Sequence, residues 1–354
     1  MRITVLGAGA WGTALAQHAS RHHEVLLWAR DAQQVDAMGR ERRNRRYLPQ
    51  IALSPAIRFS ADLGEAAAFS AQGLVVVATP VAGFEATLRA WQGHADGREQ
   101  GLIWVCKGIT PQGSYFPHQI FDALGSGVPA GPLSGPSFAL EVARGLPVAW
   151  VLASRSPSLG GVVRTALHHS AARVYTSDDV VGVEAGAALK NVIAIAAGIC
   201  DGLGLGMNAR AALITRGLAE MARFGAALGA RHETFMGLAG VGDLVLTCTG
   251  DASRNRSVGL RLAAGESLDE IVAALGHVAE GVSCARVVVE RARQVGVELP
   301  IAEAVVLVLA GEQSAREAVA ELLSREPRDE SLVADEQGAV AVSVPAPGRQ
   351  GDAR

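Results

Sequence analysis

The chain has 354 residues, of which 49% are hydrophobic and 19% are charged, and its formal net charge at neutral pH is −3. This length predicts two domains, and this composition excludes a disordered chain. The slightly negative charge excludes a general attraction to nucleic acid or to an anionic membrane, so an anion site must be built locally.

Four widely spaced cysteines predict reduced thiols in a cytoplasmic protein, with no metal site and no disulfide framework. The first residues resemble a signal peptide only superficially, because their glycines and alanines fit a strand, a turn and a helix better. Apolar stretches at 192–199 and 304–310 are shorter than the ~20 residues that cross a bilayer. We therefore expect no stable membrane insertion.

The first half of the chain alternates short apolar runs with helical patterns. Consecutive Val, Ile and Leu residues are typical of parallel strands that are covered on both faces, and the intervening helices predict βαβ units. We expect an α/β Rossmann-type N-terminal domain over residues 1–177. Its candidate strands are residues 3–6, 24–28, 74–78, 102–106, 148–153 and 173–176.

The second half has helical periodicity and no convincing series of strands. We expect an all-α C-terminal domain over residues 178–326, followed by a polar and then Pro/Gly-rich tail over residues 327–354 that is predicted to be disordered. The candidate helices are residues 183–199, 209–228, 253–264, 268–275, 282–295 and 302–310.

A glycine-rich turn, Gly7-Ala8-Gly9-Ala10-Trp11-Gly12, follows the first candidate strand directly and leads into a helix. In such a turn the first glycine permits the tight bend, the second admits a pyrophosphate, and the third allows close helix–strand packing. The helix N-terminus offers free N–H groups to the phosphates. This context favours a dinucleotide site over the alternative, an ordinary glycine turn.

The acidic residue that usually follows the second strand of such a site, where it binds the ribose of NAD, is missing. Arg30 and Asp31 stand at about that distance. Arg30 could meet a 2′-phosphate or stack on adenine, so we infer that NADP(H) is accepted as well as NAD(H). A solvated arginine is the alternative.

Lys190 lies in an apolar helical stripe and has no carboxylate three or four residues away to pair with. Such a lysine either snorkels to the surface or is placed for chemistry. Desolvation and nearby cations lower a lysine pKa, which would allow the amine to exchange protons with a substrate hydroxyl.

Three further residues in the first half are candidates on weaker grounds. Lys107 follows a candidate strand at the edge where open α/β sheets bind ligands, although lysines at strand ends are common. Gly135 and Ser137 lie in a tight loop before a helix, where helix capping alone would explain both.

A second group of candidates lies in the helical half. Asp243 ends a glycine-rich segment and could merely cap the next helix. Ser253, Arg254 and Asn255 open another helix, where a hydroxyl, a guanidinium and an amide beside free N–H groups predict a phosphate site. A solvated cap is the alternative.

Taken together, these motifs resemble those of the bacterial-type NAD(P)-dependent glycerol-3-phosphate dehydrogenases. The resemblance extends from the first strand to about residue 323. Its markers are GAGAWGTALA (7–16), NRRYLP (44–49), CKGI (106–109), LSGPSFA (133–139), EAGAALKNVIAIAAGICDGL (184–203), GLAGVGDLVLTCTGDASRNR (237–256) and AEGV (279–282). It implies a Rossmann domain joined to a helical substrate domain, with the active site in the cleft between them.

The resemblance also implies roles for individual residues. Lys190 would be the proton acceptor in glycerol 3-phosphate oxidation, and Lys107 would contact both substrate and nicotinamide. The substrate site would include Gly135, Ser137, Asp243, Ser253, Arg254 and Asn255. The dinucleotide would contact the glycine-rich turn together with Trp11, Arg30, Ala139, Arg254, Val278 and Glu280. Ala10 departs from a common serine and Ala279 from a common valine, and neither change threatens the chemistry.

The predicted activity is reversible hydride transfer between NAD(P)H and dihydroxyacetone phosphate, whose product would feed phospholipid synthesis. The predicted partner is this small-molecule substrate, and a homodimer is an open alternative to a monomer. Two other functions stay open at this point: a two-domain hydroxy-acid dehydrogenase, and a non-catalytic NADPH sensor, because a Rossmann fold alone does not prove catalysis.

Overall fold

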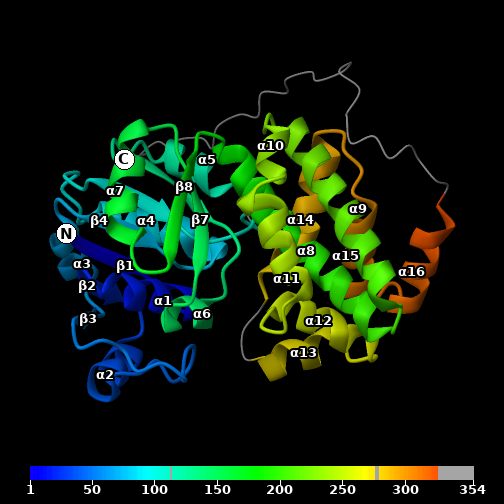
Figure 1. Ribbon diagram of the computed structural model, residues 1–354, viewed down its shortest axis with the longest axis horizontal. Helices are drawn as coiled ribbons and strands as arrows, with labels where there is room; N and C mark the ends of the chain where they lie inside the picture. Colours follow the sequence, from blue (N-terminus) through cyan, green and yellow to red (C-terminus); the bar gives the residue numbers. More distant parts are fainter. Residues whose placement is uncertain (112–113, 276–278, 326–354) are drawn as a thin grey trace, which may run out of the picture. The chain divides into compact units, whose positions relative to one another are not determined.

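The computed structural model describes residues 1–111, 114–275 and 279–325. The described chain divides into two compact units (Figure 1). Residues 1–106 and 117–180 form the first unit, and the described residues 107–111, 114–116, 181–275 and 279–325 belong to the second. The predicted tail and Val278 lie outside the described residues.

The first unit is built on one eight-stranded sheet with the strand order β3-β2-β1-β4-β5-β6-β7-β8. Neighbouring strands run parallel except β6 and β7, which are antiparallel. The strands are β1 (Arg2–Leu6), β2 (Glu24–Trp28), β3 (Ile57–Ser60), β4 (Leu74–Val77), β5 (Gly101–Trp104), β6 (Ala130–Ser134), β7 (Val148–Ala153) and β8 (Ala172–Ser177).

Helices cover both faces of this sheet, which explains why its strands are apolar at consecutive positions. On β1, Ile3 and Val5 belong to the same buried core as Leu15 of α1, whereas the hydroxyl of Thr4 donates to Ala66 O of α3 on the other face (3.3 Å). The predicted α/β Rossmann-type class is confirmed. The helices are α1 (Ala10–Ala19), α2 (Ala32–Glu41), α3 (Leu63–Ser70), α4 (Val81–Gln92), α5 (Pro117–Ala123), α6 (Ala139–Arg144) and α7 (Pro157–Leu167).

The strand order reverses direction at β1, which lies between β2 and β4. Parallel sheets bind ligands outside the carboxyl ends of their strands at such a switch point. The turn that joins β1 to α1, residues 7–9, lies at this place in the fold.

Two strands were not predicted from the sequence. β3 has the edge position in the sheet, and its exposed Arg58 breaks the apolar run. β6 contains Gly131 and Pro132, residues that are depleted in strands. It forms nevertheless, because tertiary contacts with β5 and β7 outweigh its low strand propensity.

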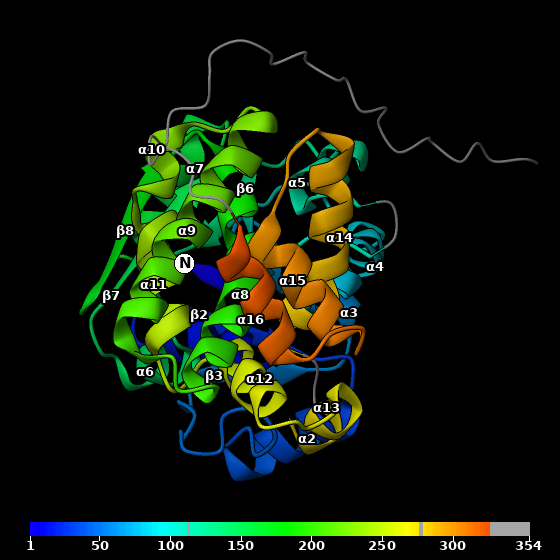
Figure 2. The same ribbon diagram turned by 90° about the vertical axis from the view of Figure 1, so that its right-hand side faces the viewer.

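All the regular elements within residues 181–275 and 279–325 are helices, which confirms the predicted all-α class of this part of the chain. Figures 1 and 2 show α8 in the middle of this unit, with the other helices around it. The elements are α8 (Val180–Gly202), α9 (Gly206–Ala227), α10 (His232–Phe235), the π-helix η1 (Leu238–Gly242), α11 (Asp243–Thr249), α12 (Arg254–Ala263), α13 (Leu268–Leu275), α14 (Glu280–Gln294), α15 (Pro300–Leu309) and α16 (Ala315–Ser324).

The helix α8 is the core of the second unit. Its 23 residues are apolar enough in composition and long enough to cross a bilayer, which the sequence estimate of shorter apolar stretches missed. However, 94% of its most apolar window is buried inside the protein, and the core helix of a globular unit passes the same test of length and composition. Charged groups on α8, Lys190 included, are therefore placed among packed side chains.

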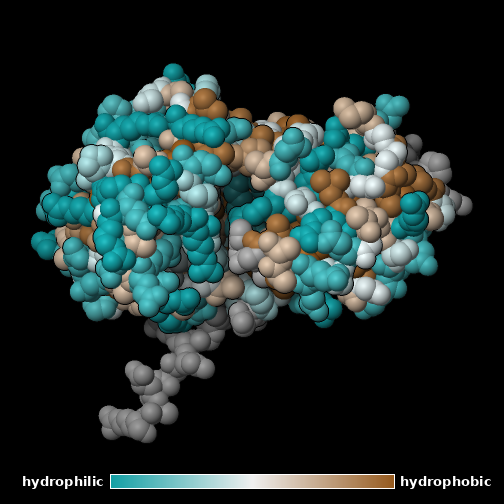
Figure 3. All heavy atoms as spheres, turned by 90° about the horizontal axis from the view of Figure 1, so that it is seen from below, coloured by the Kyte–Doolittle hydropathy of each residue, from teal (hydrophilic) through white to brown (hydrophobic). Residues whose placement is uncertain are grey.

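The two units differ in the surface seen in Figure 3. Hydrophilic residues dominate the visible face of the first unit, and apolar residues are more frequent on the helical unit. The large apolar side chains that are exposed on the helical unit are Leu205, Met207, Met236, Val245 and Leu323.

Four histidines of the first unit, His18, His22, His23 and His169, form a ring cluster between α1 and the segment after α7. The rings of His18 and His169 stack with centroids 4.2 Å apart, and His22 meets His169 edge-on at the same distance. His18 donates from Nε2 to Leu167 O (2.9 Å). Burial, aided by Arg21 and by the neighbouring histidines, lowers the pKa of His18; burial and the three other rings lower the pKa of His169 to about 4. The neutral forms of His18 and His169 are thus favoured.

We predict that this cluster makes the protein less stable in acid. Histidines in the unfolded chain bind protons below about pH 6.5, whereas His169 in the folded chain resists them down to about pH 4. The contribution of neutral His169 to the free energy of unfolding is therefore fully present above pH 6.5 and is lost as the pH falls towards 4. The melting temperature should drop by several degrees between pH 7 and pH 5, and less steeply in His169→Phe, which keeps a ring but cannot titrate. Equal slopes for the two proteins would contradict this assignment.

Candidate active site

Close packing of η1 against α8 positions the centre of the site. Gly186 lies one helical turn before Lys190 on α8, and a Cβ at Gly186 would stand 3.0 Å from Ala239 O. Residues four apart share one face of a helix, so the face that approaches η1 also carries Lys190. The π-helix ends at Gly242, and Asp243, the first residue of α11, is brought against this face.

Asp243 binds two lysines with its two carboxylate oxygens. Lys190 Nζ donates to Oδ1 (2.5 Å), and Lys107 Nζ donates to Oδ2 (2.7 Å). The exposed fractions of these side chains are 5% for Lys190, 10% for Lys107 and 1% for Asp243. The alternative that Asp243 merely caps α11 is wrong, since no side chain caps this helix.

Lys190 has a second hydrogen-bond partner that the sequence did not indicate. Its Nζ also donates to Thr247 Oγ1 (2.9 Å), whose hydroxyl donates in turn to the backbone oxygen of Asp243 (2.6 Å). Thr247 lies four residues after Asp243 and hence on the same face of α11. This i,i+4 spacing from Asp243 was the sequence signal that could have identified Thr247. The alternative that Lys190 snorkels to the surface is excluded, because its amine is bound inside the protein.

The electrostatics of the site bring the pKa of Lys190 closer to neutral pH. Burial lowers the pKa of Lys190 to about 8; the attraction of Asp243 opposes this shift, and the positive charge of Lys107 adds to it. Two amines therefore compete for one carboxylate. The amine of Lys190 can release and take up a proton near neutral pH.

The two charged neighbours of Lys190, Lys107 and Asp243, keep their charges. Burial works against the charged form of Lys107, but the charge of Asp243 and its hydrogen bond outweigh burial and raise the pKa of Lys107. Burial alone would raise the pKa of Asp243, yet the two lysines hold it below its usual value. A fixed ion pair thus stands beside one titratable amine.

A chain of amide hydrogen bonds joins Asn191, the residue after Lys190, to α12 and α14. Asn255 donates to Asn191 Oδ1 (2.9 Å) and accepts from Gly281 N (2.9 Å), and Asn191 donates to Glu280 Oε2 (3.3 Å). Both ends of the Asn255 amide are therefore occupied inside the protein. Asn191 was missed by the sequence reasoning, although it directly follows Lys190.

The start of α12 presents one charged group to solvent. Ser253 is the N-cap and accepts from Arg256 N through its Oγ (3.2 Å), whereas Arg254 is exposed. Burial raises the pKa of Glu280, and the positive charge of nearby Arg254 partly opposes this shift. Because Ser253 and Asn255 are buried, the alternative of a solvated cap is wrong for these two residues.

The glycine-rich turn of the first unit has the geometry of a phosphate cradle. Gly7 has φ +121°, and a Cβ at Gly12 would stand 1.9 Å from Gly7 O, so the protein's own packing requires glycine at both positions. At Gly9, by contrast, a Cβ would meet nothing within 4 Å. The open side at Gly9 fits a bound pyrophosphate beside the free N–H groups of α1.

The other predicted dinucleotide residues of the first unit are placed as follows. Trp11 packs near Trp150, with ring centroids 6.2 Å apart, and Ala10 begins α1. Arg30 is exposed just after β2. Asp31 does not substitute for the missing acidic residue, because its carboxylate caps α2 by accepting from Gln33 N and Gln34 N.

The side chains in the loop of Gly135 and Ser137 do not cap the helix that follows. α6, which begins at Ala139, has no side-chain cap, and the Ser137 hydroxyl donates instead to Gly135 O (3.0 Å). Gly135 has φ +131°, and a Cβ there would stand 2.8 Å from Ala149 O. The packing of this turn therefore requires glycine.

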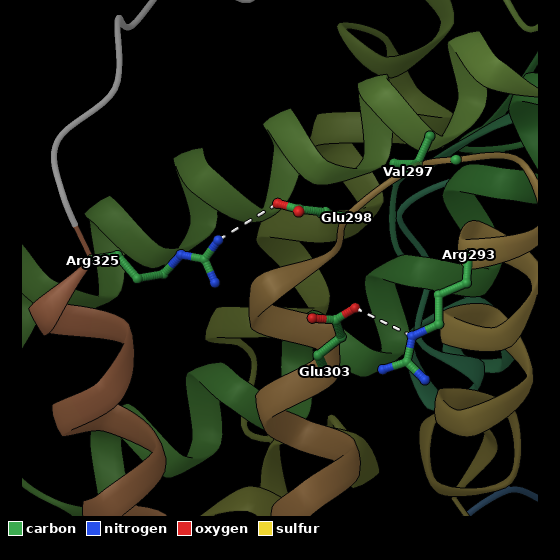
Figure 4. Close-up of a pocket in the computed structure, with 6 residues that line it drawn as sticks. Arg293, Val297, Glu298, Glu303 and Arg325 are labelled. Carbon is green, nitrogen blue, oxygen red and sulfur yellow. Dashed lines mark ion pairs between the residues drawn. The ribbon is translucent and has the colours of Figure 1, made fainter.

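A surface pocket on the helical unit contains none of the predicted site residues. Its charged side chains pair with each other, Arg293 with Glu303 (3.6 Å) and Arg325 with Glu298 (3.7 Å), as Figure 4 shows. Its cations are thus already engaged by carboxylates. Within residues 1–111, 114–275 and 279–325, no group of three or more metal-ligating side chains is found.

Comparisons with known proteins cover both halves of the chain. Residues 2–159 match the family model of the NAD-dependent glycerol-3-phosphate dehydrogenase N-terminus, and residues 179–320 match that of the C-terminus. The glycerol-3-phosphate dehydrogenase [NAD(P)+] of Variovorax paradoxus is 57% identical and aligns over 94% of this chain and 99% of its own. That of Cupriavidus pinatubonensis is 55% identical over 93% of this chain and 97% of its own.

Solved structures agree with these relatives. The crystal structure of glycerol-3-phosphate dehydrogenase from Coxiella burnetii is 39% identical, covers 92% of this chain and 99% of its own, and has a TM-score of 0.87. A D-mandelate dehydrogenase with 14% identity and a TM-score of 0.58 shares the fold alone. With both family models and these relatives matched over nearly its whole described length, the chain belongs to the NAD-dependent glycerol-3-phosphate dehydrogenase family.

Proposed function

We propose that the protein is an NAD(P)-dependent glycerol-3-phosphate dehydrogenase that interconverts dihydroxyacetone phosphate and glycerol 3-phosphate. The observation that carries this proposal is the buried Lys190 amine, whose pKa is lowered to about 8 beside Lys107 and Asp243. A sensor that only binds a dinucleotide has no use for an amine tuned in this way. We assign the phosphate cradle of the dinucleotide to the first unit, and proton transfer and the binding of the substrate phosphate to the second.

The first unit holds the dinucleotide through the turn from Gly7 to Gly12 and the N-terminus of α1. A nicotinamide dinucleotide held there would supply the hydride chemistry at C2 of the substrate. Arg30, exposed after β2, is suited to a 2′-phosphate, so both NADP(H) and NAD(H) are accepted. Ala139, Val278 and Glu280 complete the proposed contacts.

The second unit moves the proton. In oxidation, the neutral Nζ of Lys190 takes the proton of the C2 hydroxyl; in reduction, the ammonium returns it to the carbonyl oxygen. Lys107 stays charged and polarises the same oxygen. Asp243 holds both amines in position, and Thr247 fixes the direction of Lys190.

The phosphate of the substrate is assigned to the start of α12. Arg254 supplies a charge-assisted contact, and the free N–H groups of the first turn add to it. Ser253 and Asn255 shape this end of the helix from inside, with Gly135 and Ser137 as further proposed substrate contacts. A cytoplasmic location and a homodimer stay predictions from the sequence.

We predict that Lys190→Ala lowers turnover by about 10²- to 10⁴-fold, the usual range for the loss of a general acid–base. NADPH binding, measured by nicotinamide fluorescence, should be retained. In the wild-type protein, kcat/KM for glycerol 3-phosphate oxidation should rise with pH through about 8, because the deprotonated amine is the active form. Lys190→Arg keeps the charge but not the proton transfer and should be equally slow. Near-normal turnover in Lys190→Ala would refute the role.

We also predict that Arg254→Ala raises KM for dihydroxyacetone phosphate about 10- to 100-fold, the range expected for a lost charge-assisted hydrogen bond. Reduction of unphosphorylated dihydroxyacetone should be unchanged, since it lacks the group that Arg254 binds. Arg316→Ala, which removes an exposed arginine from α16, is the matched control. An equal loss with both substrates would contradict the phosphate-binding role of Arg254, and a wild-type protein that uses an unphosphorylated substrate equally well would favour a hydroxy-acid dehydrogenase.

A further inference from the structure

The segment at residues 44–49 was noted as a family marker, and the proposed function gives it no role. Its first residue, Asn44, is 1% exposed and reaches the glycine-rich turn. The two hydrogens of its Nδ2 are donated to Ala8 O (2.9 Å) and to Thr13 Oγ1 (2.8 Å), and its Oδ1 accepts from Tyr47 N (3.3 Å). One side chain thus joins its own segment to the turn and to the first turns of α1.

A second side chain holds the same backbone oxygen. Gln34 of α2 donates from Nε2 to Ala8 O (2.9 Å). A carbonyl oxygen has two lone pairs, so Asn44 and Gln34 together saturate Ala8 O. The carbonyl is therefore fixed in direction from two elements of the first unit.

The direction of this carbonyl decides where the next N–H points. The described peptide bonds are trans, and in a planar trans peptide the C=O of Ala8 and the N–H of Gly9 point in opposite directions. With Ala8 O held towards Asn44 and Gln34, the Gly9 N–H faces the other way. A Cβ at Gly9 would meet nothing within 4 Å, so the surroundings of Gly9 are open to a ligand.

We propose that Asn44, assisted by Gln34, is a positioning residue for dinucleotide binding, an inference that rests on the proposed function. By holding the Ala8–Gly9 peptide in one orientation, it aims the Gly9 N–H at the phosphates together with the free N–H groups of α1. In the opposite orientation, the Ala8 oxygen would face the phosphates and repel them. The side chains act through the backbone and touch no reacting atom.

The test compares Asn44→Leu, Gln34→Leu, the double variant and a matched control. The control is Gln33→Leu, which makes the same change at an exposed position of α2. For each protein, the Kd of NADPH is measured by nicotinamide fluorescence. The melting temperature is measured without ligand, and KM and kcat for dihydroxyacetone phosphate are measured at saturating NADPH.

We expect the Kd of NADPH to rise about three- to tenfold for each lost hydrogen bond to Ala8 O. The double variant should lose more than the product of the single effects, because either donor alone can still hold the oxygen. KM for dihydroxyacetone phosphate should change less than twofold, and Gln33→Leu should match the wild type.

The proposal is overturned if folded Asn44→Leu and Gln34→Leu bind NADPH as tightly as the wild type, or if Gln33→Leu weakens binding as much as they do. A parallel rise in both Kd and KM would likewise indicate a general structural defect and overturn it. If Asn44→Leu does not fold, the Kd of NADPH for Gln34→Leu, which changes a half-buried residue, decides the outcome. A wild-type protein that binds neither NADPH nor NADH would instead overturn the proposed function.

Discussion

One carboxylate buried between two lysines is the interaction on which the proposed chemistry depends. Buried charges are stable only when they are paired, and Asp243 can fully compensate one of its two partners. Lys107 keeps its proton, and Lys190 can lose its own near neutral pH. A proton-exchanging group is thus obtained from an ordinary lysine first by burial and then by the neighbouring charge of Lys107.

The surrounding helices are arranged to make this space. Because Gly186 has no side chain, the backbone of η1 packs directly against α8. The π-helical turn then places Asp243 at the start of α11. π-Helical turns are uncommon and are often found at functional sites. In the first unit, glycine has a comparable use: Gly7 and Gly12 allow the turn to close, and Gly9 leaves one side open.

Much of this was visible in the sequence because the signals are local. The alternation of strands and helices predicted the fold class, and the position of the glycine-rich turn after β1 predicted the dinucleotide loop. Lys190 was singled out because its apolar stripe offers it no partner. Local patterns could not identify Asp243 as the residue that binds Lys190. Asp243 is 53 residues away in the chain and reaches Lys190 only through the packing of η1 on α8.

The failures have the same origin. β6 was missed because Gly131 and Pro132 have low strand propensity, and only its neighbours in the sheet make it a strand. Helix capping was the preferred explanation of Ser137, whose hydroxyl turns back to Gly135 O instead. Thr247 and Asn191 become interpretable only when Lys190 and Asp243 are seen together.

The most direct measurement of the central claim is the titration of the Lys190 side chain by NMR, with ¹³Cε-labelled lysine and Lys190→Arg to assign the signal. The structure predicts an apparent pKa of about 8, and a higher value in Lys107→Met, because the competing cation is then removed. A Lys190 signal that titrates near the ordinary lysine value of about 10.4 in the wild-type protein would contradict the account.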